Sequence, residues 1–290
     1  MNYDAVGKHV SWFADVKRSP AVRRLIGPMH RAATASGYVL PPCGRALTWL
    51  LRSREWTNFT YDLTTKNIEY LCTTLAIVTG TDAGTLRSYV DEVSTDKALQ
   101  AHVASVTQAS SNRYQADLPA RFCKRLGWYA VVRATKPRLI VETGVDKGLG
   151  SVVLCAALLR NVAEGRPGAY VGTDINPKAG YLLSGPYASV GEIRVGDSLE
   201  TLARLDQPVD VFVNDSDHSA EYEYREYQVI AKTLSERSIL IGDNAHVTDC
   251  LWRFSRESGR SFLFWKEEPR DHWYPGGGIG FSWRPRGSAG

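Results

Sequence analysis

The sequence predicts an α/β protein whose core is a doubly wound, mostly parallel sheet, and three observations predict it. From Arg138 onward, short apolar runs rich in β-branched residues alternate with stretches of helical apolar spacing. Buried strands that alternate with helices are typical of a parallel sheet. Two further strand-like runs end the chain and fit an antiparallel hairpin at one edge, which gives seven strands.

Each expected element is placed by its residues. The strands are 138–143, 169–174, 192–197, 209–215 and 238–243, with the C-terminal pair at 261–267 and 278–283. Helical spacing is found at 151–163 and 220–234, and earlier at 62–80, 84–93 and 96–109. Residues 38–42 contain two prolines, which interrupt helices, and are predicted to form a loop. The chain is thus predicted to divide into an all-helical N-terminal portion, 1–115, and an α/β domain, 116–290.

The composition is that of an ordinary globular protein, with 43% hydrophobic and 23% charged residues. No apolar run is long enough to span a bilayer, and the N-terminus lacks the basic and apolar regions of a secretory signal. The five cysteines have no C-x-x-C spacing, which fits reduced thiols. We therefore expect a cytoplasmic protein with no membrane partner.

Positive charge is concentrated near the N-terminus. Residues 1–60 carry nine Lys and Arg against three Asp and Glu, within a net charge of +4. Such a segment can attract an anionic substrate or a nucleic acid. Because no RNA-binding or zinc-finger signature accompanies it, we interpret it as a solvated basic face and do not expect nucleic acid as a partner. The sequence leaves a homo-oligomer open.

A glycine-rich segment, VETGVDKGLGS at 141–151, joins the first expected strand to a helix. Glycines at this place let the backbone approach a nucleotide-like ligand, and the helix N-terminus favours an anionic group. The pattern T-G-x-x-x-G-x-G fits the dinucleotide loop of short-chain dehydrogenases. The overlapping pattern E-x-G-x-x-x-G fits the first motif of enzymes that bind S-adenosylmethionine (SAM).

Two residue patterns favour SAM over a dinucleotide. None of the fourteen tyrosines has a lysine four residues later, so the Tyr-x-x-x-Lys pair of a short-chain dehydrogenase is missing. Glu142 directly before the loop would approach a dinucleotide's pyrophosphate, whereas it suits the ammonium group of SAM. Asp174 ends the next strand, where a carboxylate can accept the ribose hydroxyls of either cofactor.

Polar side chains end two neighbouring strands further along the chain. Asp215 ends the fourth strand, and Asp243 and Asn244 end the fifth. Parallel strands bring these groups to one sheet edge, where two carboxylates and an amide oxygen suit Mg²⁺ or a similar divalent cation. Asp217 remains an alternative first ligand, and loop or helix capping is the alternative role for both carboxylates.

Further candidate residues surround this expected metal site. His218 can act as general base, because a histidine near its usual pKa accepts protons at neutral pH. Capping of the following helix is the alternative for His218. We expect His246, Trp273 and Tyr274 to contact the substrate, with capping or packing as their alternatives.

The ordered motifs E-x-G-x-x-x-G, TDINP, GDSLE, VNDSDH and IGDN resemble class I methyltransferases over residues 120–290. They are similar to the metal-dependent catechol and caffeoyl-CoA O-methyltransferases and to bacterial natural-product O-methyltransferases. The resemblance implies that Glu142, Gly144 and Gly148 hold the methionine end of SAM. It implies further cofactor contacts from Asp174 at the ribose and from Asp197 and Ser198 beside the adenine. Ser151 is also expected to bind the cofactor, although it lies one residue after the family's serine. At a second position that departs from the family, His218 replaces the lysine of the catechol type.

These observations predict a SAM-dependent, divalent-metal-dependent O-methyltransferase that acts on a hydroxyl of a small molecule of the natural-product, phenolic or sugar type. The helices of residues 1–115 would cap the active site, line the substrate pocket or form a dimer interface. A metal-independent N- or carboxyl-methyltransferase is the main alternative. A short-chain NAD(P)-dependent dehydrogenase and a non-catalytic SAM-binding protein are further alternatives.

Overall fold

The computed structural model describes residues 20–56 and 59–285. The chain forms two compact units: Met1–Arg52 with Asp271–Tyr274, and Ser53–Arg270 with Pro275–Gly290. The prediction that the N-terminus lacks a secretory signal concerns residues outside this described part of the chain. Within the described part of the chain, none of the helices combines the length and apolar character needed to cross a membrane.

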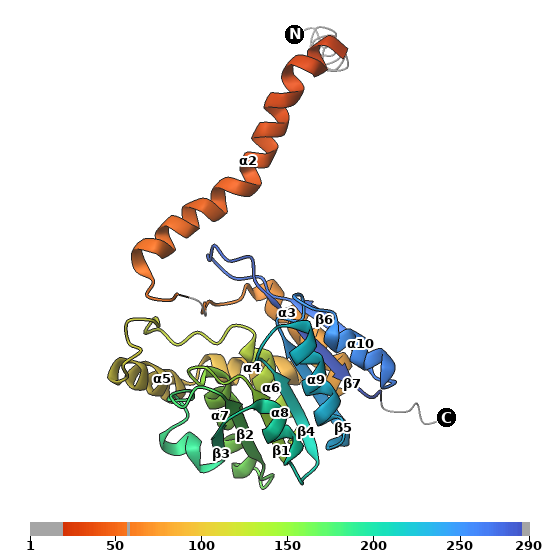
Figure 1. The fold of residues 1–290 in the computed structure, drawn as a ribbon. Coiled ribbons are helices and arrows are strands. Elements are labelled where there is room, and N and C mark those ends of the chain that lie inside the picture. Colours follow the sequence, from red (N-terminus) through yellow and green to blue (C-terminus); the bar gives the residue numbers. More distant parts are fainter. Residues whose placement is uncertain (1–19, 57–58, 286–290) are drawn as a thin grey trace. The chain divides into compact units, whose positions relative to one another are not determined.

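The larger unit is built on a seven-stranded sheet (Figure 1). Its strands are β1 (Leu139–Thr143), β2 (Ala169–Asp174), β3 (Gly191–Val195), β4 (Val209–Asn214), β5 (Leu234–Asp243), β6 (Ser261–Lys266) and β7 (Gly278–Trp283). The spatial order is β3-β2-β1-β4-β5-β7-β6. The first five strands pair in parallel, and β7 runs antiparallel to both β5 and β6. The predicted sheet, including its antiparallel C-terminal pair, is confirmed.

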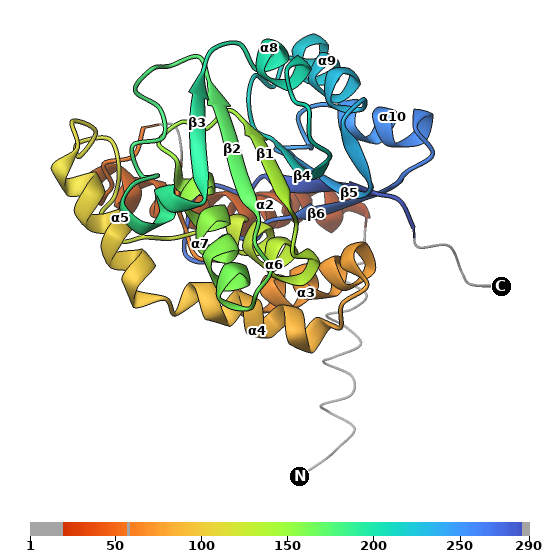
Figure 2. The same ribbon diagram turned by 90° about the horizontal axis from the view of Figure 1, so that it is seen from below.

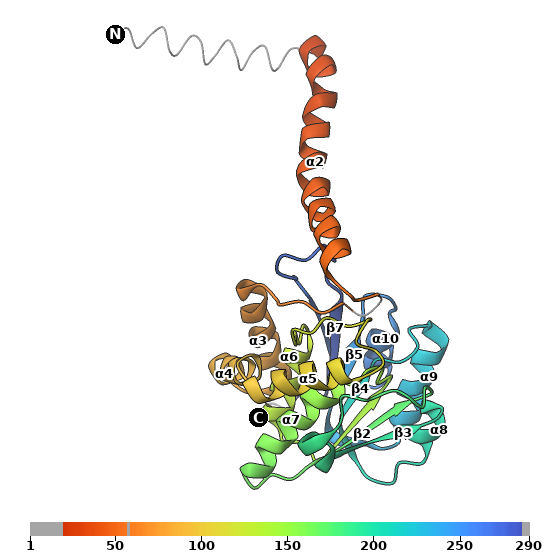
Figure 3. The same ribbon diagram turned by 90° about the vertical axis from the view of Figure 1, so that its left-hand side faces the viewer.

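Helices cover both faces of the sheet, as a doubly wound fold requires (Figures 2 and 3). One face carries α8 (Ser198–Ala203), α9 (Ala220–Ile230) and α10 (Cys250–Glu257). The other carries α6 (Arg125–Thr135) and α7 (Leu149–Ala163), with α3 (Thr65–Thr79) and α4 (Ala83–Ser94) packed against α6. The helix α5 (Lys97–Ala109) follows α4, and a 3₁₀ turn, η1 (Gly185–Ser189), precedes β3.

Capping residues begin the helices of the predicted helical portion. The side chain of Thr64 accepts from the Asn67 N–H at α3, and Asp82 accepts from the Thr85 N–H at α4. These bonds satisfy backbone donors that the first helical turn leaves without a partner. Gly80 ends α3 in the left-handed conformation, with φ of 71°. The proposed boundary at residues 115/116 stays a prediction, although α3, α4 and α5 lie in the same compact unit as the sheet.

The loop predicted at residues 38–42 was wrong, because α2 is one helix over Pro20–Arg52 that includes Pro41 and Pro42. A proline inside a helix lacks the N–H that would bond to the carbonyl four residues earlier. Here those carbonyls belong to Gly37 and Tyr38, which are exposed, so water can take the place of the missing donors.

The helix predicted at 220–234 was also too long at its C-terminal end. Helix α9 ends at Ile230, and β5 already begins at Leu234, which pairs with Val209 of β4. The pairing shifts register between Val209 and Val211, so the start of β5 is irregular. Pairing with a neighbouring strand thus decides the conformation of residues that a helical pattern also fits.

The core between the sheet and the helices α8 to α10 fixes the positions of the strand ends. Phe212 of β4, Tyr227 of α9 and Phe254 of α10 are buried there, and the Tyr227 and Phe254 rings stack with centroids 5.5 Å apart. Removing such a buried ring costs about 3–5 kcal/mol, since the lost contacts leave a cavity. Strands β4 and β5 therefore give a rigid base to the residues that follow them.

Candidate active site

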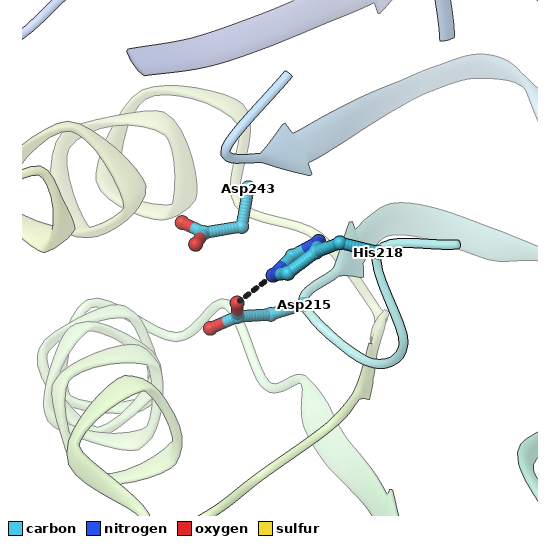
Figure 4. Close-up of side chains that lie close together, drawn as sticks. All are labelled: Asp215, His218 and Asp243. Carbon is cyan, nitrogen blue, oxygen red and sulfur yellow. Dashed lines mark ion pairs between the residues drawn. The ribbon is translucent and has the colours of Figure 1, made fainter. Parts of the chain in front are cut away.

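Two carboxylates meet where β4 and β5 end, as the sequence predicts. Asp215 follows β4 and its N–H donates to the Thr143 carbonyl at 2.8 Å, while Asp243 is the last residue of β5. One oxygen of Asp215, one of Asp243 and one ring nitrogen of His218 all lie within 4.8 Å of one another (Figure 4). We call these three residues with Asn244 the acidic cluster.

A lysine that sequence reasoning missed contacts the acidic cluster. The ammonium of Lys124, the residue before α6, lies 2.5 Å from Asp243 Oδ2 and 3.3 Å from Asn244 Oδ1. Arg125 is the next residue, and its guanidinium lies 3.9 Å from Asp215 Oδ2. No motif marks either residue, because only the packing of α6 against the sheet brings them to this place.

The charges in the cluster shift the pKa values of its members in opposite directions. Burial, and then the negative charge of Asp243, raise the pKa of the Asp215 carboxyl well above its ordinary value. Burial is the largest influence on Asp243 and by itself would raise its pKa, but the combined effect of Lys124, Asp215 and Arg125 is to lower that pKa. Burial opposes the charge of Lys124, yet Asp243 raises its pKa, so Lys124 is an ammonium ion at neutral pH.

The residues present fit a divalent cation in charge and in ligand chemistry. Four carboxyl groups interact with two cations, Lys124 and Arg125, and these four belong to Glu142, Asp215, Asp243 and Glu267. Burial raises the pKa values of Glu142, Asp215 and Glu267, so these carboxyl groups tend to hold protons, and a bound cation would favour their ionised forms. In addition, Asp243 is 3% exposed, and its Oδ1 has no hydrogen-bond partner within residues 20–56 and 59–285. A buried oxygen of this kind is costly unless a cation or donor meets it.

Asn244 and His218 face each other at the open side of the cluster. His218 Nε2 lies 3.8 Å from Asp215 Oδ1 and 3.3 Å from Asn244 Nδ2. Asn244 has a φ of 51°, a left-handed conformation that asparagine tolerates better than most residues. Asp217, the alternative first ligand, instead accepts hydrogen bonds from the Ser219 N–H and hydroxyl before α9. The geometry therefore places Asp215 in the cluster and gives Asp217 a local capping contact.

The three residues predicted to contact the substrate lie in two different parts of the chain. His246 lies two residues after Asn244 in the larger unit and is largely exposed. The part of its ring that is buried, and then the charge of Lys124, lower its pKa. Trp273 and Tyr274 belong to the smaller compact unit. There the Trp273 ring lies 5.3 Å from the ring of Trp49 of α2, and 6.2 Å from that of Tyr274.

The glycine-rich loop requires glycine at two of the predicted positions. Gly144 has a φ of 79°, and a Cβ there would lie 2.1 Å from the Asp215 carbonyl oxygen. Gly148 has a φ of 89°, and a Cβ there would lie 2.9 Å from the Gly180 Cα. Both need glycine for conformation and for space. Gly144 also shows that the loop after β1 touches the backbone that carries Asp215.

Glu142, the second-last residue of β1, is fully buried. Its carboxyl accepts hydrogen bonds from the Ser151 hydroxyl at 3.1 Å and from the Tyr170 hydroxyl of β2. Burial raises the pKa of Glu142 to about 7, although these hydrogen bonds oppose the shift. Ser151 is thus a partner of Glu142, and Tyr170 is a member of this network that the sequence did not indicate.

The two acidic residues predicted beside the ribose and adenine also hold backbone. Asp174 Oδ2 accepts from the N–H groups of Val145 and Asp146, at 3.0 and 2.8 Å. Asp197 caps α8 by accepting from the Leu199 N–H at 2.7 Å. The hydroxyl of Ser198 bonds to the carboxyl of Glu226 and to Tyr222, in a buried polar group behind the start of α8.

Comparisons with known proteins match the part of the chain that contains the glycine-rich loop and the acidic cluster. Residues 141–245 match the model of a methyltransferase domain family. No curated protein matches the chain.

Similar solved structures include the O-methyltransferase TomG of Streptomyces achromogenes, involved in tomaymycin synthesis and solved with SAM. It is 20% identical, covers 64% of this chain and 90% of its own, and has a TM-score of 0.49. A methyltransferase from Geobacter sulfurreducens is 20% identical, with 63% and 90% covered and a TM-score of 0.47. An O-methyltransferase from Bacillus cereus is 16% identical, with 68% and 96% covered and a TM-score of 0.46.

The sheet and the matched domain together define the class of protein. The strand order with its antiparallel β7 and the match over residues 141–245 are those of a class I methyltransferase. Members of this class take a methyl group from SAM. The resemblance to class I methyltransferases inferred from the sequence is therefore confirmed.

Proposed function

We propose that the protein is a SAM-dependent, divalent-metal-dependent O-methyltransferase that acts on a hydroxyl group of a small molecule. One observation carries the proposal: the glycine-rich loop and the acidic cluster share one edge of the sheet, with Gly144 packed directly on the backbone of Asp215. A methyl donor on the loop and a hydroxyl at the cluster would therefore be close together. Proximity of this kind supplies much of the rate enhancement of a group transfer.

On the cofactor side, the loop glycines Gly144 and Gly148 allow the close approach of the donor. Glu142, held by Ser151 and Tyr170, supplies negative charge beneath the loop for the ammonium group of SAM. Asp174 and the start of α8, at Asp197 and Ser198, then take the ribose and the adenine. These assignments follow the strand ends of β1, β2 and β3, in that spatial order from the centre of the sheet to its edge.

On the acceptor side, Asp215 and Asp243 supply the two carboxylates that would hold the cation. A bound divalent cation makes a hydroxyl more acidic and fixes its position. Of Asn244 and His218, one completes the ligand set and the other contacts the acceptor, where His218 can accept the hydroxyl proton. His246, Trp273 and Tyr274 are proposed acceptor contacts, and the helices of residues 1–115 are proposed to shape the acceptor pocket or a dimer interface.

A metal-independent N- or carboxyl-methyltransferase is the second candidate, and the position of Lys124 favours it. The ammonium already compensates Asp243, so part of the charge that a cation would supply is present in the chain. This candidate needs the same SAM loop but no divalent ion. The two functions therefore differ in a property that is simple to measure.

The test combines SAM binding with methyl transfer to a panel of phenols, sugars and hydroxylated natural products. Calorimetry should detect SAM binding with and without a chelator, because the loop itself lacks a metal ligand. Methyl transfer to a hydroxyl should stop with chelator and return with added Mg²⁺ or Mn²⁺. Full activity in the presence of chelator would reject the metal and favour the second candidate.

A further inference from the structure

Lys124 already occupies two oxygens of the acidic cluster. Its ammonium contacts Asp243 Oδ2 and Asn244 Oδ1, and the residue is 9% exposed. The N–H of Lys124 donates to Glu267 Oε1 at 3.0 Å, which anchors the residue at the start of α6. The contact is therefore part of the folded core and not the chance position of a surface side chain.

The oxygens that Lys124 holds are poor ligands for a second cation. A divalent ion on either oxygen would lie beside an ammonium, and two positive charges repel strongly where little water screens them. Asn244 is the predicted ligand most affected, because its single carbonyl oxygen faces Lys124. Asp243 is less affected, since its Oδ1 has no hydrogen-bond partner in the described part of the chain.

Because Lys124 holds the amide oxygen of Asn244, a ring nitrogen of His218 is the alternative third ligand. The amide Nδ2 of Asn244 can only donate, so His218 Nε2 accepts its N–H at 3.3 Å and is the ring nitrogen that carries the lone pair. A cation that binds this nitrogen takes the place of that hydrogen bond. This same atom lies 3.8 Å from Asp215 Oδ1. Figure 4 shows the imidazole nitrogen next to the Asp215 carboxylate, with the Asp243 side chain beside them, and one ligand atom of each residue lies within 4.8 Å of the others.

We propose that Asp215, Asp243 and His218 form the ion-binding set, and that Lys124 excludes Asn244 from it. The inference rests on the proposed function, because it concerns the same cation. Imidazole is a good ligand for Mn²⁺, Fe²⁺, Co²⁺ and Zn²⁺, whereas Mg²⁺ selects oxygen ligands. The site therefore prefers a divalent transition ion to Mg²⁺. Lys124 is a positioning residue that sets this preference through Asn244 and Asp243.

The test titrates the metal-free, full-length protein separately with Co²⁺ and Mg²⁺. Calorimetry gives both affinities, and the visible absorption of Co²⁺ reports whether imidazole binds the ion. The wild type should bind Co²⁺ at least tenfold more tightly than Mg²⁺. His218→Gln should lose that preference and change the Co²⁺ spectrum. Asn244→Ala should change the Co²⁺ affinity less than threefold, because Asn244 is not a ligand.

Lys124→Met should free Asp243 Oδ2 and Asn244 Oδ1 and raise the affinity for Mg²⁺ at least tenfold. The ratio of the Co²⁺ affinity to the Mg²⁺ affinity should therefore become smaller. Lys124→Arg should keep the wild-type ratio because the cation is retained. Lys97→Met on the exposed start of α5 is the matched control and should change neither affinity. If Lys124→Met does not fold, the His218 and Asn244 variants decide the ligand set by themselves.

Four outcomes would overturn the inference. Equal affinities of the wild type for Co²⁺ and Mg²⁺ would show that the site has no preference for the transition ion. A Co²⁺ spectrum unchanged in His218→Gln, or a tenfold loss of Co²⁺ affinity in Asn244→Ala, would restore the amide as the third ligand. These three results leave the proposed function intact. If neither the wild type nor Lys124→Met binds either ion, the inference fails together with the metal requirement.

Discussion

Lys124 Nζ lies 2.5 Å from Asp243 Oδ2, and this buried pair joins residues that are 119 positions apart in the chain. It connects the start of α6 to the end of β5. The pair thus fixes the acidic cluster to the helix that precedes the glycine-rich loop.

Asp243→Asn should destabilise the protein by about 3 kcal/mol, because it leaves the buried ammonium of Lys124 without its counter-ion. The double variant Lys124→Met with Asp243→Asn should recover part of that loss. Chemical denaturation at neutral pH without metal measures both. Glu268→Gln, which removes the exposed pair of Glu268 with Lys66, is the control and should cost below about 1 kcal/mol. Strict additivity of the two single variants would show that the pair has no energetic coupling.

Gly144→Ala should abolish measurable SAM binding. A methyl group there would meet the carbonyl of Asp215 at 2.1 Å, so the end of β1 and the start of the loop would have to move. Gly165→Ala is a matched control: its φ of 73° is similar, but no heavy atom of the described residues lies within 4 Å of the added Cβ. That control should cost only about 1 kcal/mol of backbone strain and bind SAM normally. Calorimetry on both variants makes the comparison, and equal SAM affinities would contradict it.

Glu142 should make stability depend on pH in the range between its unfolded and folded pKa values. Because burial raises its folded pKa from 4.5 to about 7, the folded state holds the proton more tightly than the unfolded state. The resulting stabilisation is complete below pH 4.5 and is lost as the pH rises through 7. The shift corresponds to about 3 kcal/mol.

Glu142→Gln removes that titration, so the wild type should lose stability relative to the variant between pH 5 and pH 8. Urea unfolding of the cofactor-free proteins at both pH values measures the difference. Glu192→Gln on the exposed face of β3 should retain the wild-type pH dependence. A stability difference between wild type and Glu142→Gln that stays constant from pH 5 to pH 8 would disprove the assignment.

Asp174→Asn should weaken SAM binding by at least tenfold. The carboxylate Oδ2 accepts the N–H groups of Val145 and Asp146, and an asparagine in either orientation cannot reproduce all of the wild-type contacts. Binding should fall both through the loop and through the proposed ribose contact. Calorimetric titration with SAM tests this. Asn176→Ala, in the turn beside Asp174, is the control: it shows how much affinity is lost when the turn is loosened but the Asp174 carboxylate is kept. Unchanged affinity in Asp174→Asn would remove Asp174 from the cofactor site.

The sheet and the paired carboxylates could be predicted because each depends on a local pattern. Apolar runs mark β1 to β7, and an aspartate at a strand end must lie at the sheet edge once the strands are parallel. Lys124 could not be predicted this way, since its contact with Asp243 depends on how α6 packs. The partners of Glu142 have a similar origin: Tyr170 reaches it from the neighbouring strand β2, and no spacing in the sequence encodes that contact.

The errors came from competing local signals. Two prolines indicated a loop where α2 continues through Pro41 and Pro42. The apolar spacing of residues 220–234 fits a helix, although Leu234 pairs with Val209 in the sheet. In the second case, tertiary pairing overrides a weak preference of the sequence.

Asp174 also has a consequence for how a cofactor would be received. Its hydrogen bonds to Val145 and Asp146 hold the loop after β1 through contacts within the chain itself. A loop that is already held in this way loses less conformational entropy when a ligand binds than a loop that the ligand must order. Part of the affinity for a cofactor would then come from preorganisation of the loop and not from a direct contact.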